Sequence, residues 1–283
     1  MKTESQSARV SIPPFFKGGS LAALVLALAA PLAHGADEAN SPWTWGGDLR
    51  LREVGIENAN ALDEANASAE RHFQRYRLRT WGQYAPSDSL KLNGRVMWEG
   101  RHYHTPDIAA FDEWYSGAVM LDNLFVAVEK PGGLPLNLKL GRQDIFLGNG
   151  WLMADGTPID GSRTGYLDAL RSTWTLSPQT SLEAILIQQD AKTTLTLNGK
   201  DEDQTEQDEQ GAIFYLRHKW NPTTDVDAYY FYKDNTRVTG EAANGFRVNN
   251  GTAFPSASDD GQVHALGARL ETALTPQWKL RAE

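Results

Sequence analysis

Basic side chains recur at every second position in two runs of this sequence. Arg75, Arg77 and Arg79 form one run, and Arg50 and Arg52 form another. Alternate side chains of an extended chain project from one face, so each run places guanidinium groups side by side. Guanidinium groups bind carboxylates and lower the barrier to anions in a pore. Their mutual repulsion also has to be relieved, and for the run at 75–79 we expect about two carboxylates nearby.

Other chemistry is poorly supported by the residue types and their spacing. His102 and His104 could point the same way on a strand, but they lack a third metal ligand at a defined spacing. The acidic residues at 201–209 lack the glycine-centred spacing of a calcium loop. We find no phosphate loop, nucleophile elbow or ordered Ser/His/Asp set, and the chain has no cysteine. The sequence predicts no metal, no cofactor and no enzymatic activity, although its many carboxylates leave a glycan-cleaving enzyme open.

Composition narrows the class of protein only in part. The 283 residues carry a net charge of -9, which argues against a nucleic-acid partner. A mean hydropathy of -0.47 resembles that of a soluble protein. Strands that alternate apolar and polar residues average to a similar value, so membrane strands are equally compatible with it. The lack of cysteine fits a protein exported through an oxidising compartment.

The first 35 residues have the pattern of a cleavable signal peptide. Lys2, Arg9 and Lys17 give a basic start, residues 21–32 are apolar, and Ala33 and Gly35 supply small residues at the usual cleavage positions. The apolar stretch is well short of the ~20 residues of a spanning helix. We therefore predict a signal peptide at 1–35 and one domain at 36–283.

The elements that position the basic residues are predicted strands. Apolar residues recur at every second position over eleven segments, and short connections with turn residues alternate with long polar connections. The segments lie around 43–52, 73–84, 90–99, 124–128, 136–140, 166–176, 182–186, 214–216, 226–232, 266–270 and 278–280. The long connections lie at 55–70, 100–117, 144–165, 190–210 and 235–261.

This layout is typical of an all-β, antiparallel up-and-down transmembrane β-barrel with short turns on one side and long loops on the other. Aromatic residues near both strand ends fit the two membrane interfaces. A soluble β-sandwich is the alternative fold. Because bacterial barrels have an even number of strands, we expect the eleven segments to be the N-terminal part of a longer barrel, or a truncated one.

The polar parity of the segments defines the predicted lumen. Basic residues dominate it, and negative charge concentrates in the connections, so we expect a basic lumen below an acidic rim. Alternatively, the arginines pair with lumenal carboxylates and brace the wall. The predicted lumenal cations are Arg50, Arg52, Arg75, Arg77, Arg79, Lys91, Arg95, Lys139, Arg171, Arg217, Lys219, Lys233 and Arg269, with Asp48, Glu99, Glu129, Glu183 and Glu271 beside them.

Several segments resemble the alginate export family. They are residues 138–145, 148–152, 161–164 and 167–171, together with the openings at 48–53 and 75–79. The resemblance implies a monomeric barrel of about eighteen strands, of which this chain holds about eleven, with an arginine-rich lumen that passes a polyuronate. Arg142 shares the parity of the apolar Leu140, so it faces the lumen only if a bulge lies at Gly141. The candidate lumen charges that the resemblance carries over are Arg50, Arg52, Arg75, Arg77, Arg79 and Arg171.

These observations predict a porin or exporter in the cell outer membrane. It would pass an anionic or polar saccharide by diffusion, in contact with outer-membrane lipid and with periplasmic export components as further partners. The alternatives are a secreted β-rich enzyme that acts on acidic polysaccharide and a soluble binding protein. The sequence leaves open the solute, the direction of transport and the gating.

Overall fold

The alternating segments form strands in the computed structural model of the chain, which describes residues 41–57, 70–105, 113–154, 165–193, 195–205, 208–236 and 261–283. The described residues between Pro42 and Glu283 form one compact unit. The predicted signal peptide at 1–35 lies outside the described residues and stays a prediction. Among the described residues, no helix is long and apolar enough to cross a membrane.

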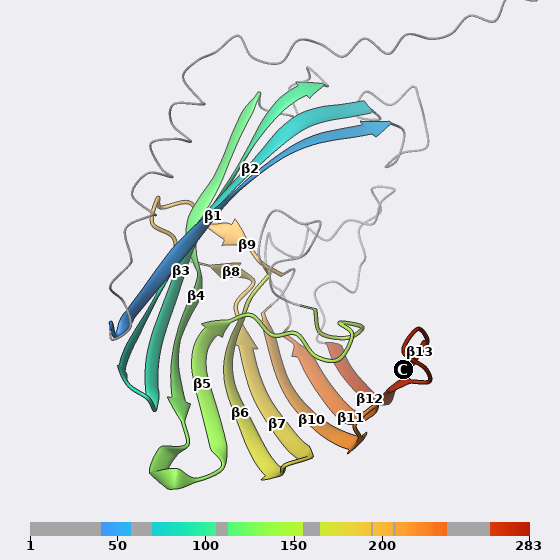
Figure 1. Cartoon of the computed structure of the whole chain (residues 1–283). Coiled ribbons are helices and arrows are strands. Elements are labelled where there is room, and N and C mark those ends of the chain that lie inside the picture. Colours follow the sequence, from blue (N-terminus) through green and yellow to red (C-terminus); the bar gives the residue numbers. More distant parts are fainter. Residues whose placement is uncertain are drawn as a thin grey trace, which may run out of the picture. The chain divides into compact units, whose positions relative to one another are not determined.

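Eleven strands pair in chain order into one antiparallel up-and-down sheet, as Figure 1 shows. Their number, order and short connections confirm the sequence prediction, and a 3₁₀ turn, η2 (Pro131–Gly133), forms one short connection. The strands are β1 (Trp43–Glu57), β2 (Glu70–Ser87), β3 (Leu90–Thr105), β4 (Trp114–Glu129), β5 (Leu136–Gln143), β6 (Leu167–Ser177), β7 (Thr180–Gln189), β10 (Glu209–Asn221), β11 (Thr224–Asn235), β12 (Gly261–Ala273) and β13 (Lys279–Ala282).

The register keeps side chains of one kind on the same face of this sheet. Leu49 lies opposite Leu78, and the next pair along, Asp48 and Arg79, projects to the other face. We call the two sides the apolar face and the charged face. The apolar face includes Leu49, Leu78, Leu140, Leu186 and Leu266, and the charged face includes Asp48, Arg79, Glu99, Glu183 and Asp227.

Burial on the two faces is the reverse of that in a water-soluble sheet. Leu140 and Leu266 on the apolar face are 61% and 86% exposed, whereas Glu99 and Asp227 on the charged face are 4% and 2% exposed. A soluble sheet buries its aliphatic side chains and leaves its carboxylates in water. The apolar face of this sheet therefore lacks the cover that a soluble core would supply.

Two of the long connections, predicted as polar loops, pack against the sheet over part of their length. Residues 144–154, which we call the strap, pack Ile145 and Leu147 against Ile185, Ile213 and other buried residues of the charged face. The prediction of a polar loop at 144–165 is wrong for residues 144–154, because Ile145 and Leu147 find apolar positions on β6, β7, β10 and β11. The rest of that loop, 155–164, lies outside the described residues.

The connection between β7 and β10 also joins the sheet. It contains a short two-stranded sheet, β8 (Lys192–Thr193) with β9 (Glu202–Asp203), which the sequence did not predict. Its residues Leu195 and Leu197 hydrogen-bond to the backbone of β4 at Leu121 and Val119, at 3.0 and 2.7 Å. They do so because β5 pairs only with the second half of β4, from Leu124 onward, and leaves the first half open.

Candidate functional site

The charged face of β1–β3 carries the predicted arginine runs, and the two expected carboxylates lie among them. Asp48 accepts hydrogen bonds from Arg77 Nη2 at 3.2 Å and from Arg79 Nε at 2.7 Å. Glu99 Oε1 accepts from Arg75 Nη2 at 3.4 Å and from Arg101 Nε at 2.8 Å. Each carboxylate thus bridges two guanidinium groups, which relieves the repulsion along the run.

Arg50 and Arg52 extend this basic region across the strand pair. Arg50 lies opposite Arg77, and Arg52 lies opposite Arg75. Three donor atoms of Arg75 and Arg77 are buried without a hydrogen-bond partner, namely Nε of both residues and Nη1 of Arg77. A buried guanidinium donor that lacks a partner is costly, so the close packing of Arg75 and Arg77 is held at some cost in stability.

A second group of predicted residues lies on β3–β5. Arg95 Nε bonds Asp122 at 2.8 Å, and its two terminal nitrogens bond the Asp144 carboxylate at 2.9 Å each. Lys91 pairs with Glu129 at 2.5 Å. Arg95 is thus held from two sides, while the half-exposed pair of Lys91 and Glu129 contributes little to stability.

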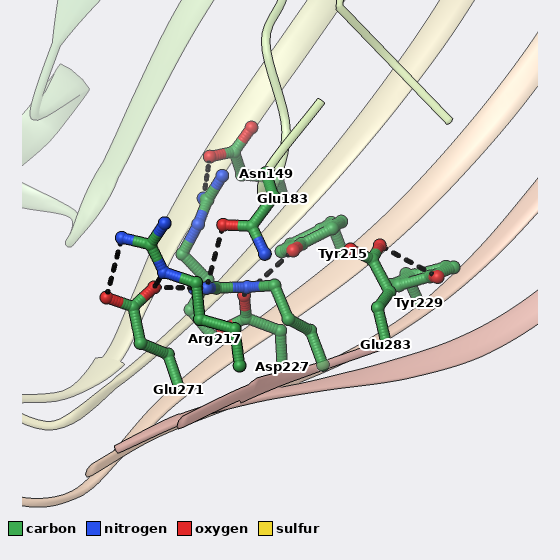
Figure 2. Close-up of polar contacts among 10 residues, drawn as sticks. Asn149, Glu183, Tyr215, Arg217, Asp227, Tyr229, Glu271 and Glu283 are labelled. Atoms are coloured by element: carbon green, nitrogen blue, oxygen red, sulfur yellow. Dashed lines mark hydrogen bonds and ion pairs between the residues drawn. The ribbon is translucent and has the colours of Figure 1, made fainter. Parts of the chain in front are cut away.

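The third group lies on the neighbouring strands β6, β7 and β10–β12, and Figure 2 shows its side chains converging. Glu183 is buried and accepts from Arg171 Nε at 2.7 Å and from Arg217. On β11, Asp227 accepts hydrogen bonds from Arg269 and from the hydroxyl of the buried Tyr215. These charges are held by contacts between strands that are neighbours in the sheet.

The strap links these groups across the charged face. Asp144, at its start, holds Arg95 of β3, and Asn149 Oδ1 accepts from Arg269 Nη1 of β12 at 3.4 Å. Its side chains Ile145 and Leu147 are almost fully buried against the sheet, whereas Phe146 between them is 57% exposed. The strap is therefore anchored by an apolar patch and covers part of a face that is otherwise polar.

Arg142 has the parity of the apolar face, as its position in the sequence predicted. No register shift occurs at Gly141 on either side of β5, so no bulge turns Arg142 to the charged face. Arg142 is nevertheless buried, because it forms two bonds with Asp168 at 2.9 and 2.8 Å and one with Thr193 Oγ1 at 2.9 Å. It also stacks on the Tyr166 ring at 3.9 Å. Arg142 therefore joins the end of β5 to β6 and to β8.

The sequence predicted the basic residues of the charged face more completely than the carboxylates that bind them. It missed Asp122, Asp144, Asp168 and Asp227, which each bind an arginine. Asp227 could have been found, since it alternates with the apolar residues of its strand. Asp122 lies at a register shift between β3 and β4, and a bulge cannot be read from parity.

The His102 and His104 pair meets a third histidine on the apolar face. The ring centroids of His72 and His104 lie 5.0 Å apart, and those of His102 and His104 lie 4.6 Å apart. In the part of the chain that the structure describes, no group of three or more His, Cys, Asp or Glu residues could hold a metal ion. His102 instead stacks on Trp114 at 4.6 Å, as part of an aromatic cluster.

Comparison with protein-family models gives no match, and comparison with curated proteins gives none. The resemblance to the alginate export family therefore stays a prediction from the residues.

Proposed function

We propose that the sheet is part of the wall of an outer-membrane β-barrel channel, with the apolar face toward lipid and the charged face toward a water-filled lumen. The supporting observation is the reversed burial of the two faces. Membrane barrels place apolar side chains outward into hydrocarbon and polar ones inward, with the same period of two. In a soluble protein, an uncovered apolar face of this extent would be an aggregation hazard.

The proposal includes closure of the sheet, because a sheet in hydrocarbon cannot leave edge hydrogen-bonding groups without partners. In the described residues, β1 and β13 lie at the two ends of the strand order. The channel would act as a monomer, as in the alginate export family, to which we propose this chain belongs. It would need no cofactor, since diffusion through a pore requires only a path and a favourable lining.

The solute that we propose is an anionic or polar saccharide. The arginine ladder at Arg75, Arg77 and Arg79 adjoins Arg50 and Arg52 on the next strand, and this excess of guanidinium groups over carboxylates favours anionic groups in transit. Most of the other lumenal cations are neutralised by carboxylates, so the lining combines a basic stretch on β1–β3 with balanced ion pairs elsewhere. Such a lining attracts an anion without trapping it.

The test is fractionation followed by conductance. The full protein should be found in the outer membrane, show heat-dependent gel mobility and conduct ions in a planar bilayer. A secreted enzyme or binding protein on acidic polysaccharide would be found in the soluble fraction and would not conduct. Recovery of folded protein from the soluble fraction without detergent would contradict the proposal.

A further inference from the structure

A cavity of about 510 Å³ opens on the charged face at β1–β5, toward the short-turn ends of the strands. Its lining combines an indole, Trp81, with the amides of Gln83, Asn93 and Asn123 and the cations of Arg95 and Lys139. Amides bind hydroxyl groups in both directions, as donor and as acceptor. Arg79, the last residue of the arginine ladder, also lines the cavity, which adds aromatic and amide groups to the charged ones.

Trp81 is the unusual residue in this cavity. Its neighbours in the run, Arg77 and Arg79, share its face of the sheet, yet its own side chain is apolar and 42% exposed. Cross-strand from it lies Gly46, where an added Cβ would lie only 2.7 Å from the indole atom Cζ2. The indole therefore rests on the bare backbone at Gly46, which fixes one ring face and leaves aromatic surface open to the cavity.

The cations that line the cavity are not equivalent. Arg79 pairs with Asp48, and Arg95 pairs with Asp122 and Asp144. Lys139 Nζ forms no ion pair with a described residue and lies 4.3 Å from the centroid of the Phe125 ring. The cavity thus offers one ammonium group, a fixed aromatic surface and several amides.

We propose that this cavity is a pyranose-binding subsite, in which Trp81 stacks on the ring of one sugar residue and Lys139 adds a single favourable charge. The apolar C–H groups of a pyranose face pack on an indole, while its hydroxyl groups remain free for the amides. The ring face is thus recognised separately from the charge. The inference rests on the proposed channel function, because only a lumenal cavity would meet the solute.

The experiment separates the two contributions with two probes, a neutral glucose hexamer and a uronate hexamer. Affinity is measured by calorimetry on the full protein in detergent, and the half-blocking concentration is measured on the ion current in bilayers. Trp81→Ala should weaken both probes about threefold to tenfold, since an aromatic contact contributes that much. Lys139→Met should weaken only the uronate, by about tenfold.

Three further variants serve as controls. Trp81→Phe keeps an aromatic ring and should retain most of the affinity. Gly46→Ala changes none of the side chains that bind the sugar but displaces the indole of Trp81, and should act like Trp81→Ala. Trp220→Ala removes an exposed tryptophan from the apolar face and should change neither probe's affinity.

Equal affinity of wild type and Trp81→Ala for the glucose hexamer would overturn the subsite, even if the protein conducts. Loss of the neutral probe on Lys139→Met would also overturn it, because ring and charge would then not be separate. Sugar binding in detergent without any conductance would instead contradict the channel and leave the subsite standing.

Discussion

Replacing Glu183 with glutamine tests whether the charged face is a buried ion-pair network. The Glu183 side chain is 4% exposed and lies between Arg171 and Arg217, whose side chains are 21% and 35% exposed. Each pair has a gross attraction of about 4 kcal/mol at an effective dielectric constant of 20. Much of this offsets the cost of taking the charges out of water, and removal of one partner of a buried pair typically costs about 3–5 kcal/mol.

Because both arginines keep some contact with water, we expect Glu183→Gln to lower the free energy of unfolding by about 3 kcal/mol. The matched control is Glu129→Gln, whose side chain is 42% exposed and pairs with Lys91 alone. Its cost should stay below about 1 kcal/mol. Urea unfolding in lipid vesicles, followed by tryptophan fluorescence, gives both values. Equal costs for the two variants would refute the reasoning, because burial would then not determine the energy of the pair.

Three other predictions follow from the two faces and the strap. Leu49→Arg should cost about 2–4 kcal/mol in the same unfolding assay, and Thr44→Arg on the charged face much less; similar values would reverse the assignment of the faces. Changing all three arginines at 75–79 to serine should lower the anion-to-cation permeability ratio at least about twofold, and an unchanged ratio would remove them from the pathway. Ile145→Ala should lower the free energy of unfolding by about 2–5 kcal/mol and, because the strap is then held less firmly, raise single-channel conductance. Phe146→Ala, at an exposed neighbour, should leave the conductance unchanged.

The sheet could be predicted because its signal is local. Each strand alternates between two environments, so Leu49 and Leu51 identify β1 without knowledge of any partner strand. Short connections are equally local, since turn residues act within a few positions. The same parity placed Arg77 and Glu183 on the charged face, where the structure also has them.

The exceptions to the alternating pattern could be identified only from the tertiary structure. Gly46 lies between the polar residues Thr44 and Asp48 of the same face and has no side chain, yet the indole of Trp81 packs on it. Arg142 has the parity of Leu140, yet Asp168 and Thr193 enclose it. In each case the neighbour comes from another strand or connection, and its identity depends on register.

The sequence by itself determined which residues form strands and which side chains share a face, because a period of two is imposed residue by residue by the solvent on each side. Only the tertiary structure decided how the charges are paired, where the strap lies and what lines the cavity. Asp144 meets Arg95 over 49 positions of chain, and Asn149 meets Arg269 over 120. Such contacts depend on the path of the whole chain, and no local pattern encodes them.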